Sequence, residues 1–320
     1  MIEDPSSPIK NLVVIVTGAS SGIGEETARQ FAKRGARVVL AARRRERLEK
    51  LVAEIEESNG TALAVPTDLT DVDQITNLVK TTVDTFARID VLANIAGWGR
   101  YDWLDELSAE DLRRQYEVNV LGLAELTRQV LPVMKAQRSG HIINMISYAS
   151  KISTPPITVY ASTKYALEGL TDGLRRELIP WGIRVSRVHP SGVKGTEFNP
   201  QAGREGGLRY RAVPVGKVSR ERVAREILGL VENPRRARFF SRLYDVPVAL
   251  NLLFPELIDW FSALWVRRKL ANSNPEAALT LTRSARYSNS FSLIKLAVIA
   301  LSAVTVARAV FHRSKPGENN

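Results

Sequence analysis

The sequence predicts an α/β protein with a doubly wound parallel sheet flanked by helices, followed by a helical C-terminal extension. Short apolar runs rich in β-branched residues alternate with helical patterns between residues 12 and 231, and this alternation is typical of parallel sheets. The first apolar run leads into a glycine-rich loop that opens a helix. The chain has 320 residues, of which 44% are hydrophobic, enough for one large domain with an appendage.

Six strands are expected, because six short apolar runs have the composition of strands that are buried on both faces. They cover residues 12–17, 38–42, 62–65, 89–93, 141–146 and 183–188. Apolar residues recur with helical spacing in the segments between and after these strands. The first expected helix ends at Arg34. The other expected helices cover residues 45–58, 71–86, 108–135, 157–179 and 219–231. Gly35 suits the end of the first helix, and Ser108 suits the start of the fourth.

We expect a single domain over residues 1–245 and an extension over residues 246–320. Within the domain, residues 190–218 are rich in glycine, proline and arginine and are expected to form a loop or lid. The extension contains two strongly apolar stretches, residues 246–266 and residues 293–311.

Two interpretations of the extension stay open. In the first, residues 246–266 form a lid or a monotopic membrane anchor, and Arg267-Arg268-Lys269 face anionic head groups. Residues 293–311 would then reach roughly 28 Å as a helix, barely a bilayer core, and would span the membrane or lie on it. In the second interpretation, Pro247 and Pro255 separate helices that pack together or form an oligomer surface.

The composition excludes several kinds of site. There is no cysteine, which excludes disulfides, a thiol nucleophile and Cys-ligated zinc. The three histidines are widely separated, so no metal site is expected. The net charge is +11, but few stacking aromatic residues accompany the arginine clusters, so nucleic-acid binding is not expected. The polar N-terminus has no apolar core, so we expect a cytoplasmic protein, with membrane association through its C-terminal segments as the open alternative.

Tyr160 and Lys164 are the first candidates for chemistry. Four residues apart on an expected helix, they lie on one face, one turn from each other. A neighbouring cation lowers the pKa of a phenol from about 10 toward neutral pH, so the pair suits proton transfer in an alcohol or carbonyl reaction. The alternative is an exposed tyrosine beside a solvated lysine, and the spacing alone does not separate the two.

The glycine loop after the first strand is the second candidate. Gly18, Gly22 and Gly24 let the backbone turn tightly and approach a pyrophosphate. The helix that follows offers free N–H groups and the positive end of its dipole. Strand, loop and helix occur in the order that a dinucleotide site needs. The alternative is that the glycines serve only the turn and the packing of the helix.

Ordered motifs over roughly residues 8–232 resemble those of the short-chain dehydrogenase/reductase family. They are Thr17-Gly-Ala-Ser-Ser-Gly-Ile-Gly24, Asn94-Ile-Ala-Gly97, Asn119, Ser147, Tyr160-Ala-Ser-Thr-Lys164 and Pro190-Ser-Gly192. The resemblance implies a single Rossmann-type domain that holds both NAD(P) and a small-molecule substrate. It also implies a homodimer or homotetramer. Membrane-associated members with a similar C-terminal segment suggest a hydrophobic, lipid-like or steroid-like substrate.

The resemblance also implies the cofactor contacts. They are Thr17, Gly18, Ser20, Ser21, Gly22, Ile23 and Gly24 around the pyrophosphate, Asp68 at the adenine with Leu69 beside it, Asn94, Ala96 and Gly97 in support, Val193 and Thr196 toward the nicotinamide amide, and Tyr160 and Lys164 at the nicotinamide ribose. The chain departs from the family at Ile95, where a second asparagine is usual. It also departs at Pro190-Ser191-Gly192, where a Pro-Gly pair is usual.

The choice of cofactor can be argued from charge. A carboxylate at the end of the second strand would bind a ribose 2′-hydroxyl and repel a 2′-phosphate. This chain has Ala42 there, followed by Arg43 and Arg44, and guanidinium groups suit a 2′-phosphate. We therefore expect NADP(H) rather than NAD(H), with Arg43 as the main contact and Arg44 in support. The alternative is that these arginines are merely solvated at a helix start.

The resemblance implies four catalytic residues. Tyr160 is the proton donor or base, Lys164 lowers its pKa, Ser147 hydrogen-bonds the substrate oxygen, and Asn119 anchors a water-linked proton relay. The expected activity is NADP(H)-dependent reduction of a carbonyl group or oxidation of the corresponding alcohol. Two alternatives stay open: a non-catalytic nucleotide-binding or scaffold protein at a membrane, and an epimerase or dehydratase that uses the same tyrosine.

Overall fold

The computed structural model describes residues 8–198, 217–240 and 245–273. Most of the expected lid at 190–218 and the whole apolar stretch at 293–311 lie outside these residues. The chain divides into two compact units between Phe240 and Ser241. The first unit carries the sheet and the alternating strands and helices expected of an α/β domain, and the described residues of the second unit form two helices.

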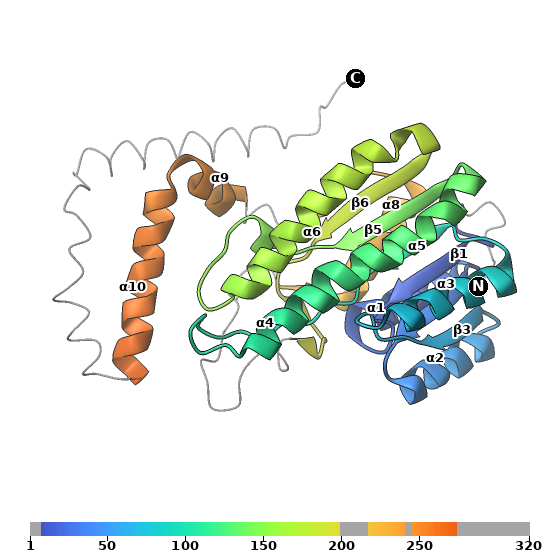
Figure 1. The fold of residues 1–320 in the computed structure, drawn as a ribbon, viewed down its shortest axis with the longest axis horizontal. Helices are drawn as coiled ribbons and strands as arrows, with labels where there is room; N and C mark the ends of the chain where they lie inside the picture. Colours follow the sequence, from blue (N-terminus) through green and yellow to red (C-terminus); the bar gives the residue numbers. More distant parts are fainter. Residues whose placement is uncertain (1–7, 199–216, 241–244, 274–320) are drawn as a thin grey trace, which may run out of the picture. The chain divides into compact units, whose positions relative to one another are not determined.

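Seven parallel strands form the sheet of the first unit, in the order β3-β2-β1-β4-β5-β6-β9 (Figure 1). They are β1 (Val13–Thr17), β2 (Arg37–Ala42), β3 (Thr61–Pro66), β4 (Val91–Asn94), β5 (Gly140–Met145), β6 (Ile183–His189) and β9 (Ala237–Phe239). The six expected strands are confirmed. Successive strands are added on opposite sides of β1, so the order reverses between β1 and β4, and ligands of such sheets bind at the carboxyl ends of the strands at this point.

Three short strands were not predicted. β9 is only three residues long, and flanking arginines hide it from a search for apolar runs. The strands β7 (Val193–Lys194) and β8 (Val218–Ser219) pair with each other in parallel inside the region expected to be a loop.

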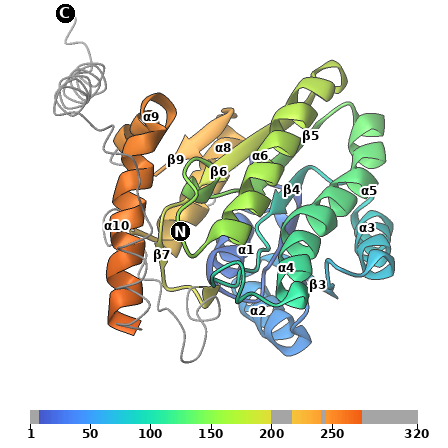
Figure 2. The same cartoon turned by 60° about the vertical axis from the view of Figure 1, so that its left-hand side comes forward.

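Helices cover both faces of the sheet (Figures 1 and 2). They are α1 (Gly22–Lys33), α2 (Arg45–Glu57), α3 (Val72–Phe86), α4 (Ala109–Tyr116), α5 (Gly122–Gln137), α6 (Thr158–Glu177) and α8 (Arg220–Glu232). Side chains alternate along each strand, so Val14 and Val16 pack in one buried cluster with α1, α2 and α8. Ile15 between them packs in a second cluster with α3, α5 and α6. The two clusters pack against opposite faces of the sheet and so fix the carboxyl end of β1, where the glycine loop begins.

The helix expected over residues 108–135 begins as predicted but is not continuous. Ser108 caps α4 by accepting from the backbone N–H of Asp111 at 3.0 Å. Glu117–Leu121 then form a π-helical turn before α5 begins. Such turns insert one residue into the helical repeat and often occur at functional sites, and apolar spacing does not reveal them.

The second unit contains α9 (Asp245–Leu253) and α10 (Pro255–Ser273). The expected break at Pro255 is confirmed, but Pro247 does not break the chain because it lies in the first turn of α9, where no N–H is required. Within the described residues, no one helix has the length and apolar composition to cross a membrane. The pair Val246–Leu253 and Pro255–Arg268 meets that test only jointly, and it is bent by 111° at its break.

Candidate active site

The loop between β1 and α1 is held in a shape that depends on glycine. Gly18 and Gly22 have φ angles of +69° and +60°, in the left-handed region that glycine adopts without strain. A Cβ on Gly24 would lie 2.3 Å from the carbonyl oxygen of Gly18. The backbone therefore folds tightly around the start of α1, whose first-turn N–H groups and dipole suit an anion. This glycine cradle fits the pyrophosphate of a dinucleotide.

Thr17 joins this loop to the residues that follow the neighbouring strand β4. The Thr17 hydroxyl accepts from the N–H groups of Ile95 and Ala96 at 2.9 and 3.0 Å. A Cβ on Gly18 would lie 3.0 Å from the Cα of Ala96, so the two loops touch. Ile95, the departure from the family pattern, takes part in this contact through its backbone and leaves the turn intact.

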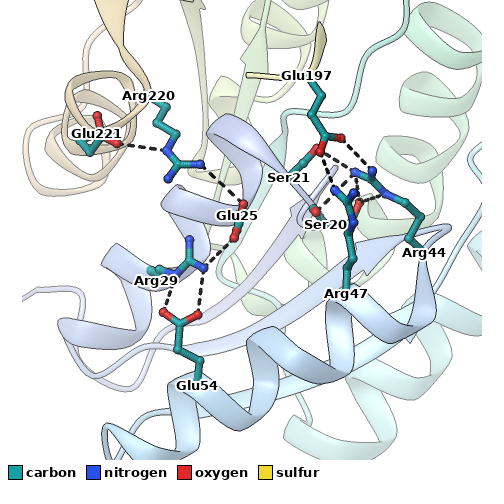
Figure 3. Close-up of polar contacts among 10 residues, drawn as sticks. All are labelled: Ser20, Ser21, Glu25, Arg29, Arg44, Arg47, Glu54, Glu197, Arg220 and Glu221. Atoms are coloured by element: carbon teal, nitrogen blue, oxygen red, sulfur yellow. Dashed lines mark hydrogen bonds and ion pairs between the residues drawn. The ribbon is translucent and has the colours of Figure 1, made fainter. Parts of the chain in front are cut away.

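Arg44 lies against the glycine loop. Its guanidinium group donates to the hydroxyl groups of Ser20 and Ser21 at 3.0 and 2.8 Å (Figure 3). Arg43 is 56% exposed, and its Nη1 lies 4.0 Å from Asp68 Oδ2. Arg44 thus lies on the glycine loop and Arg43 beside Asp68, and the expectation that Arg43 is the main contact of a 2′-phosphate stays a prediction. Leu69 follows Asp68 and is buried.

Tyr160 and Lys164 lie one turn apart on α6, and both are buried. Lys164 is 2% exposed and Tyr160 is 8% exposed, so the interpretation as an exposed tyrosine beside a solvated lysine is wrong. The Lys164 ammonium lies 5.7 Å from the centre of the Tyr160 ring and donates to the carbonyl of Met145 at 3.1 Å. Burial lowers the pKa of Lys164 to about 8, because desolvation penalises the charged form.

Asn119 lies in the π-helical turn and is completely buried. Its Nδ2 donates to the carbonyl of Trp98 at 2.7 Å and to Thr163 Oγ1 at 3.1 Å, and its Oδ1 accepts from the N–H of Trp98 at 2.8 Å. A Cβ on Gly97 would lie 3.5 Å from this Oδ1 and 3.7 Å from Lys164 Nζ. Asn119 therefore fixes the loop after β4 beside α6 and close to the lysine.

Ser147 follows β5, and a histidine that was not among the predicted site residues lies beside it. The Ser147 hydroxyl accepts from the N–H of Ala149 at 3.1 Å. His189, fully buried at the end of β6, has its Nδ1 3.2 Å from the carbonyl oxygen of Ser147, so Nδ1 carries the hydrogen and donates. Burial lowers the pKa of His189 to about 4, which keeps the ring neutral at pH 7. In the sequence, its position directly before the Pro190-Ser191-Gly192 motif was the feature that could have indicated a place near the site.

Aromatic rings surround the Tyr160 ring. Those of Tyr101 and Phe198 each lie 5.5 Å from it, centre to centre. A Cβ on Gly99 would approach Tyr160 Cδ2 to 3.1 Å and Phe198 Cζ to 3.0 Å, so Gly99 lets the rings approach. The side of the tyrosine that these residues face is therefore apolar. Neither Tyr101 nor Phe198 was predicted, because single aromatic residues in loops carry no pattern.

Thr196 lies beside the glycine loop, since its Cγ2 is 3.3 Å from the Cβ position of Gly22. Val193, three residues earlier, lies in β7. The next residue, Glu197, was not predicted at all, yet its carboxylate binds Arg44. In the ranges that the structure describes, no group of three or more His, Cys, Asp or Glu residues could hold a metal ion.

The model of the short chain dehydrogenase family matches residues 12–205. An uncharacterized oxidoreductase of Staphylococcus saprophyticus is 39% identical over 187 residues, which cover 58% of this chain and 75% of the relative. An uncharacterized oxidoreductase of Listeria innocua is 38% identical with the same coverage of both chains.

Two solved structures are similar over most of their length. A short-chain dehydrogenase/reductase of Burkholderia phymatum in complex with NAD superposes with a TM-score of 0.71 at 27% identity, over 80% of this chain and 96% of that one. A metagenomic short-chain oxidoreductase in complex with NADP superposes with a TM-score of 0.62 at 29% identity, over 73% and 98%. The neighbours thus hold either dinucleotide.

Proposed function

Because the chain belongs to the short-chain dehydrogenase family of oxidoreductases, we propose that it reduces a hydrophobic carbonyl compound with NADPH, or oxidises the corresponding alcohol. The observation that carries the proposal is the buried Tyr160–Lys164 pair. Lys164 is a desolvated cation held one turn from a phenol, an arrangement that costs stability and suits proton transfer.

Each side chain has a proposed role in this reaction. A bound nicotinamide would supply the hydride to the carbonyl carbon, or take it from the alcohol. Tyr160 gives its phenolic proton to the carbonyl oxygen, and the Lys164 ammonium stabilises the negative charge that develops on the phenol oxygen. Ser147 donates a hydrogen bond to the same substrate oxygen. Asn119 holds the loop after β4 against α6 and anchors the water-linked proton relay.

We propose that the cofactor binds residues at the carboxyl ends of the parallel strands. The glycine loop from Thr17 to Gly24 would hold the pyrophosphate, and Asp68 with Leu69 would lie at the adenine. Asn94, Ala96 and Gly97 would support the ribose and nicotinamide half, with Val193 and Thr196 at the carboxamide. Lys164 would also bind the nicotinamide ribose.

A preference for NADP(H) is supported by charge. No carboxylate ends β2, where Ala42 stands and is followed by Arg43 and Arg44. Arg44 is the better placed of the two because it already contacts Ser20 and Ser21, while Arg43 lies by Asp68. Both are proposed to contact the 2′-phosphate. The NADP complex of the metagenomic relative is consistent with this preference, and the NAD complex from Burkholderia phymatum makes NAD the alternative.

A hydrophobic substrate is supported by the rings of Tyr101 and Phe198 around Tyr160. Lipid-like and steroid-like carbonyl compounds belong to this class. We also propose that the second unit contacts a membrane surface, since large apolar side chains on α9 and α10 are exposed, among them Leu252, Leu253 and Phe261. We also propose assembly as a homodimer or homotetramer, as the resemblance to the family implies.

The test is NADPH oxidation with a panel of long-chain and polycyclic ketones and aldehydes. We expect Tyr160→Phe to lower turnover by about 10²- to 10⁴-fold, the usual contribution of a general acid, with NADPH affinity changed only a few-fold. Tyr165→Phe, on the exposed side of the same helix, is the matched control and should keep its turnover. Equal turnover in wild type and Tyr160→Phe would contradict the proposed role. Conversion of a substrate without net NADPH oxidation would favour the epimerase or dehydratase reading instead.

A further inference from the structure

Glu197 has no part in the proposed reaction, yet its carboxylate binds two guanidinium groups. Its Oε2 accepts from Arg44 Nη1 at 2.8 Å, and its Oε1 accepts from Arg47 Nη1 at 2.7 Å. The same Arg44 donates to Ser20 and Ser21 on the glycine loop (Figure 3). The carboxylate is therefore bound by two arginines, and one of them also contacts two serines, so that these four side chains form a ring of donor groups after β1 and β2.

This ring has the chemistry of a phosphate site. Guanidinium groups present planar, paired N–H donors that match the oxygens of a phosphate, and serine hydroxyls add neutral donors. Arg44 and Arg47 stand at the start of α2, directly after β2, where the 2′-position of an adenosine ribose is expected in this fold. A carboxylate is the anion that the chain itself can supply to such donors.

We propose that Glu197 determines cofactor specificity, because its carboxylate occupies the subsite that Arg44, Arg47, Ser20 and Ser21 offer to the 2′-phosphate of NADP(H). The phosphate binds by displacing this internal anion, so Glu197 weakens NADP(H) binding while NAD(H), which has no 2′-phosphate, is little affected. The inference rests on the proposed cofactor.

The backbone on both sides of Glu197 favours displacement of the side chain alone. Thr196 is packed against Gly22 of the loop, and Phe198 is packed against Tyr160. Glu197 itself is 41% exposed, so its two ion pairs are the kind that solvent weakens. Ion pairs of this exposure each change an equilibrium by up to about fivefold, which leaves a doubly charged phosphate able to compete.

The experiment compares the binding of 2′,5′-ADP and 5′-AMP by isothermal titration calorimetry, since these probes share the adenosine and differ in the 2′-phosphate. We expect Glu197→Gln to tighten 2′,5′-ADP binding about three- to tenfold and to change 5′-AMP binding by less than about twofold. The same tightening is expected for NADPH but not for NADH. No turnover is needed for any of these measurements.

Glu54→Gln is the matched control. Glu54 forms a similar paired contact with Arg29 on the neighbouring surface of α1 and α2 (Figure 3), so this variant removes the same charge away from Ser20 and Ser21. Equal tightening of 2′,5′-ADP in both variants would reduce the effect to general electrostatics and overturn the inference. Unchanged or weaker binding in Glu197→Gln would overturn it as well.

The outcomes separate the inference from the proposed cofactor. If wild type binds 2′,5′-ADP no better than 5′-AMP but Glu197→Gln does, the preference for NADP(H) fails while the competition by Glu197 stands. If wild type prefers 2′,5′-ADP and Glu197→Gln adds nothing, the cofactor proposal stands and the inference fails. In an Arg44→Ala background, Glu197→Gln should give less than a twofold gain, because the main phosphate donor is gone.

Discussion

Lys164 combines a proposed catalytic role with a cost in stability. Its amine is buried and desolvated, and it donates a hydrogen bond to the carbonyl of Met145. A folded pKa of about 8 lies below the value of about 10.4 for the unfolded chain. Below pH 8 the folded state therefore holds a charged amine that burial disfavours. This penalty is relieved as the pH rises from about 8 to about 10.4.

We predict that Lys164→Met stabilises the protein while it strongly lowers turnover. The pKa difference means that burying the charged amine costs roughly 3 kcal/mol at pH 7, and Lys164→Met removes this cost. The variant also loses the hydrogen bond to Met145, which lowers its stability by about 1 kcal/mol. The net gain in the free energy of unfolding should be about 2 kcal/mol, measured by urea unfolding at pH 7. Turnover should fall at least about 100-fold. A destabilised Lys164→Met would show that the amine contributes more through its contacts than it loses by burial.

His141 gives the contact between β5 and β6 a dependence on pH. Its Nε2 lies 2.8 Å from Ser186 Oγ across the two strands. Burial, with a smaller effect of Arg184, lowers the pKa of His141 to about 3, against about 6.5 in the unfolded chain. Between these values the unfolded chain binds a proton that the folded protein does not, so stability is complete above pH 6.5 and falls as the pH drops.

At pH 5 the loss from His141 should be about 2 kcal/mol, at 1.36 kcal/mol per pH unit. His189, whose pKa is lowered to about 4, adds a loss of the same sign. The measurement is the slope of unfolding free energy against pH between 7 and 5. His141→Gln should flatten that slope by about half, whatever it does to the stability at pH 7. A slope that does not change would mean that the His141 ring takes up its proton over the same pH range in the folded and the unfolded protein.

The glycine loop is the element on which cofactor binding most depends. A Cβ at Gly24 would lie 2.3 Å from a backbone oxygen, and backbone cannot yield as a flexible side chain does. We predict that Gly24→Ala costs about 1–3 kcal/mol of stability by overpacking and lowers NADPH affinity at least about tenfold. Gly173→Ala on α6 is the control, because a Cβ there meets nothing within 4 Å and alanine favours a helix. Unchanged NADPH affinity in Gly24→Ala would separate the loop from the cofactor.

Elements with a periodic composition could be predicted from the sequence, and single contacts could not. The apolar runs gave six strands and the helices between them, since burial on both faces leaves a plain signature. The π-helical turn at Asn119 and strand β9 have no such signature. At the site, Tyr160 and Lys164 are recognisable by spacing. Glu197 and Phe198 depend on where a loop passes in space, which local sequence does not record.

At the scale of the whole molecule, the buried clusters of the described residues all belong to the first unit. Every residue in the three buried clusters of the described chain lies at or before Phe240, and the division into units falls directly after it. A chain that ends at Tyr244 should therefore keep its melting temperature, and its NADPH affinity should change by less than about twofold, since these three clusters stay whole. Loss of either would show that the extension contributes to the fold or the site.

The same truncation tests the proposed contact with a membrane. Leu252, Leu253 and Phe261 are exposed, and Arg267 with Arg268 follows on α10. Each basic residue near an anionic surface contributes about 1 kcal/mol, so the full chain should sediment with phosphatidylcholine vesicles that contain phosphatidylserine. The Arg267→Glu/Arg268→Glu variant should bind them at least about tenfold more weakly. The truncated chain should stay in solution. A full chain that also stays in solution would contradict the proposed membrane contact but not the proposed active site.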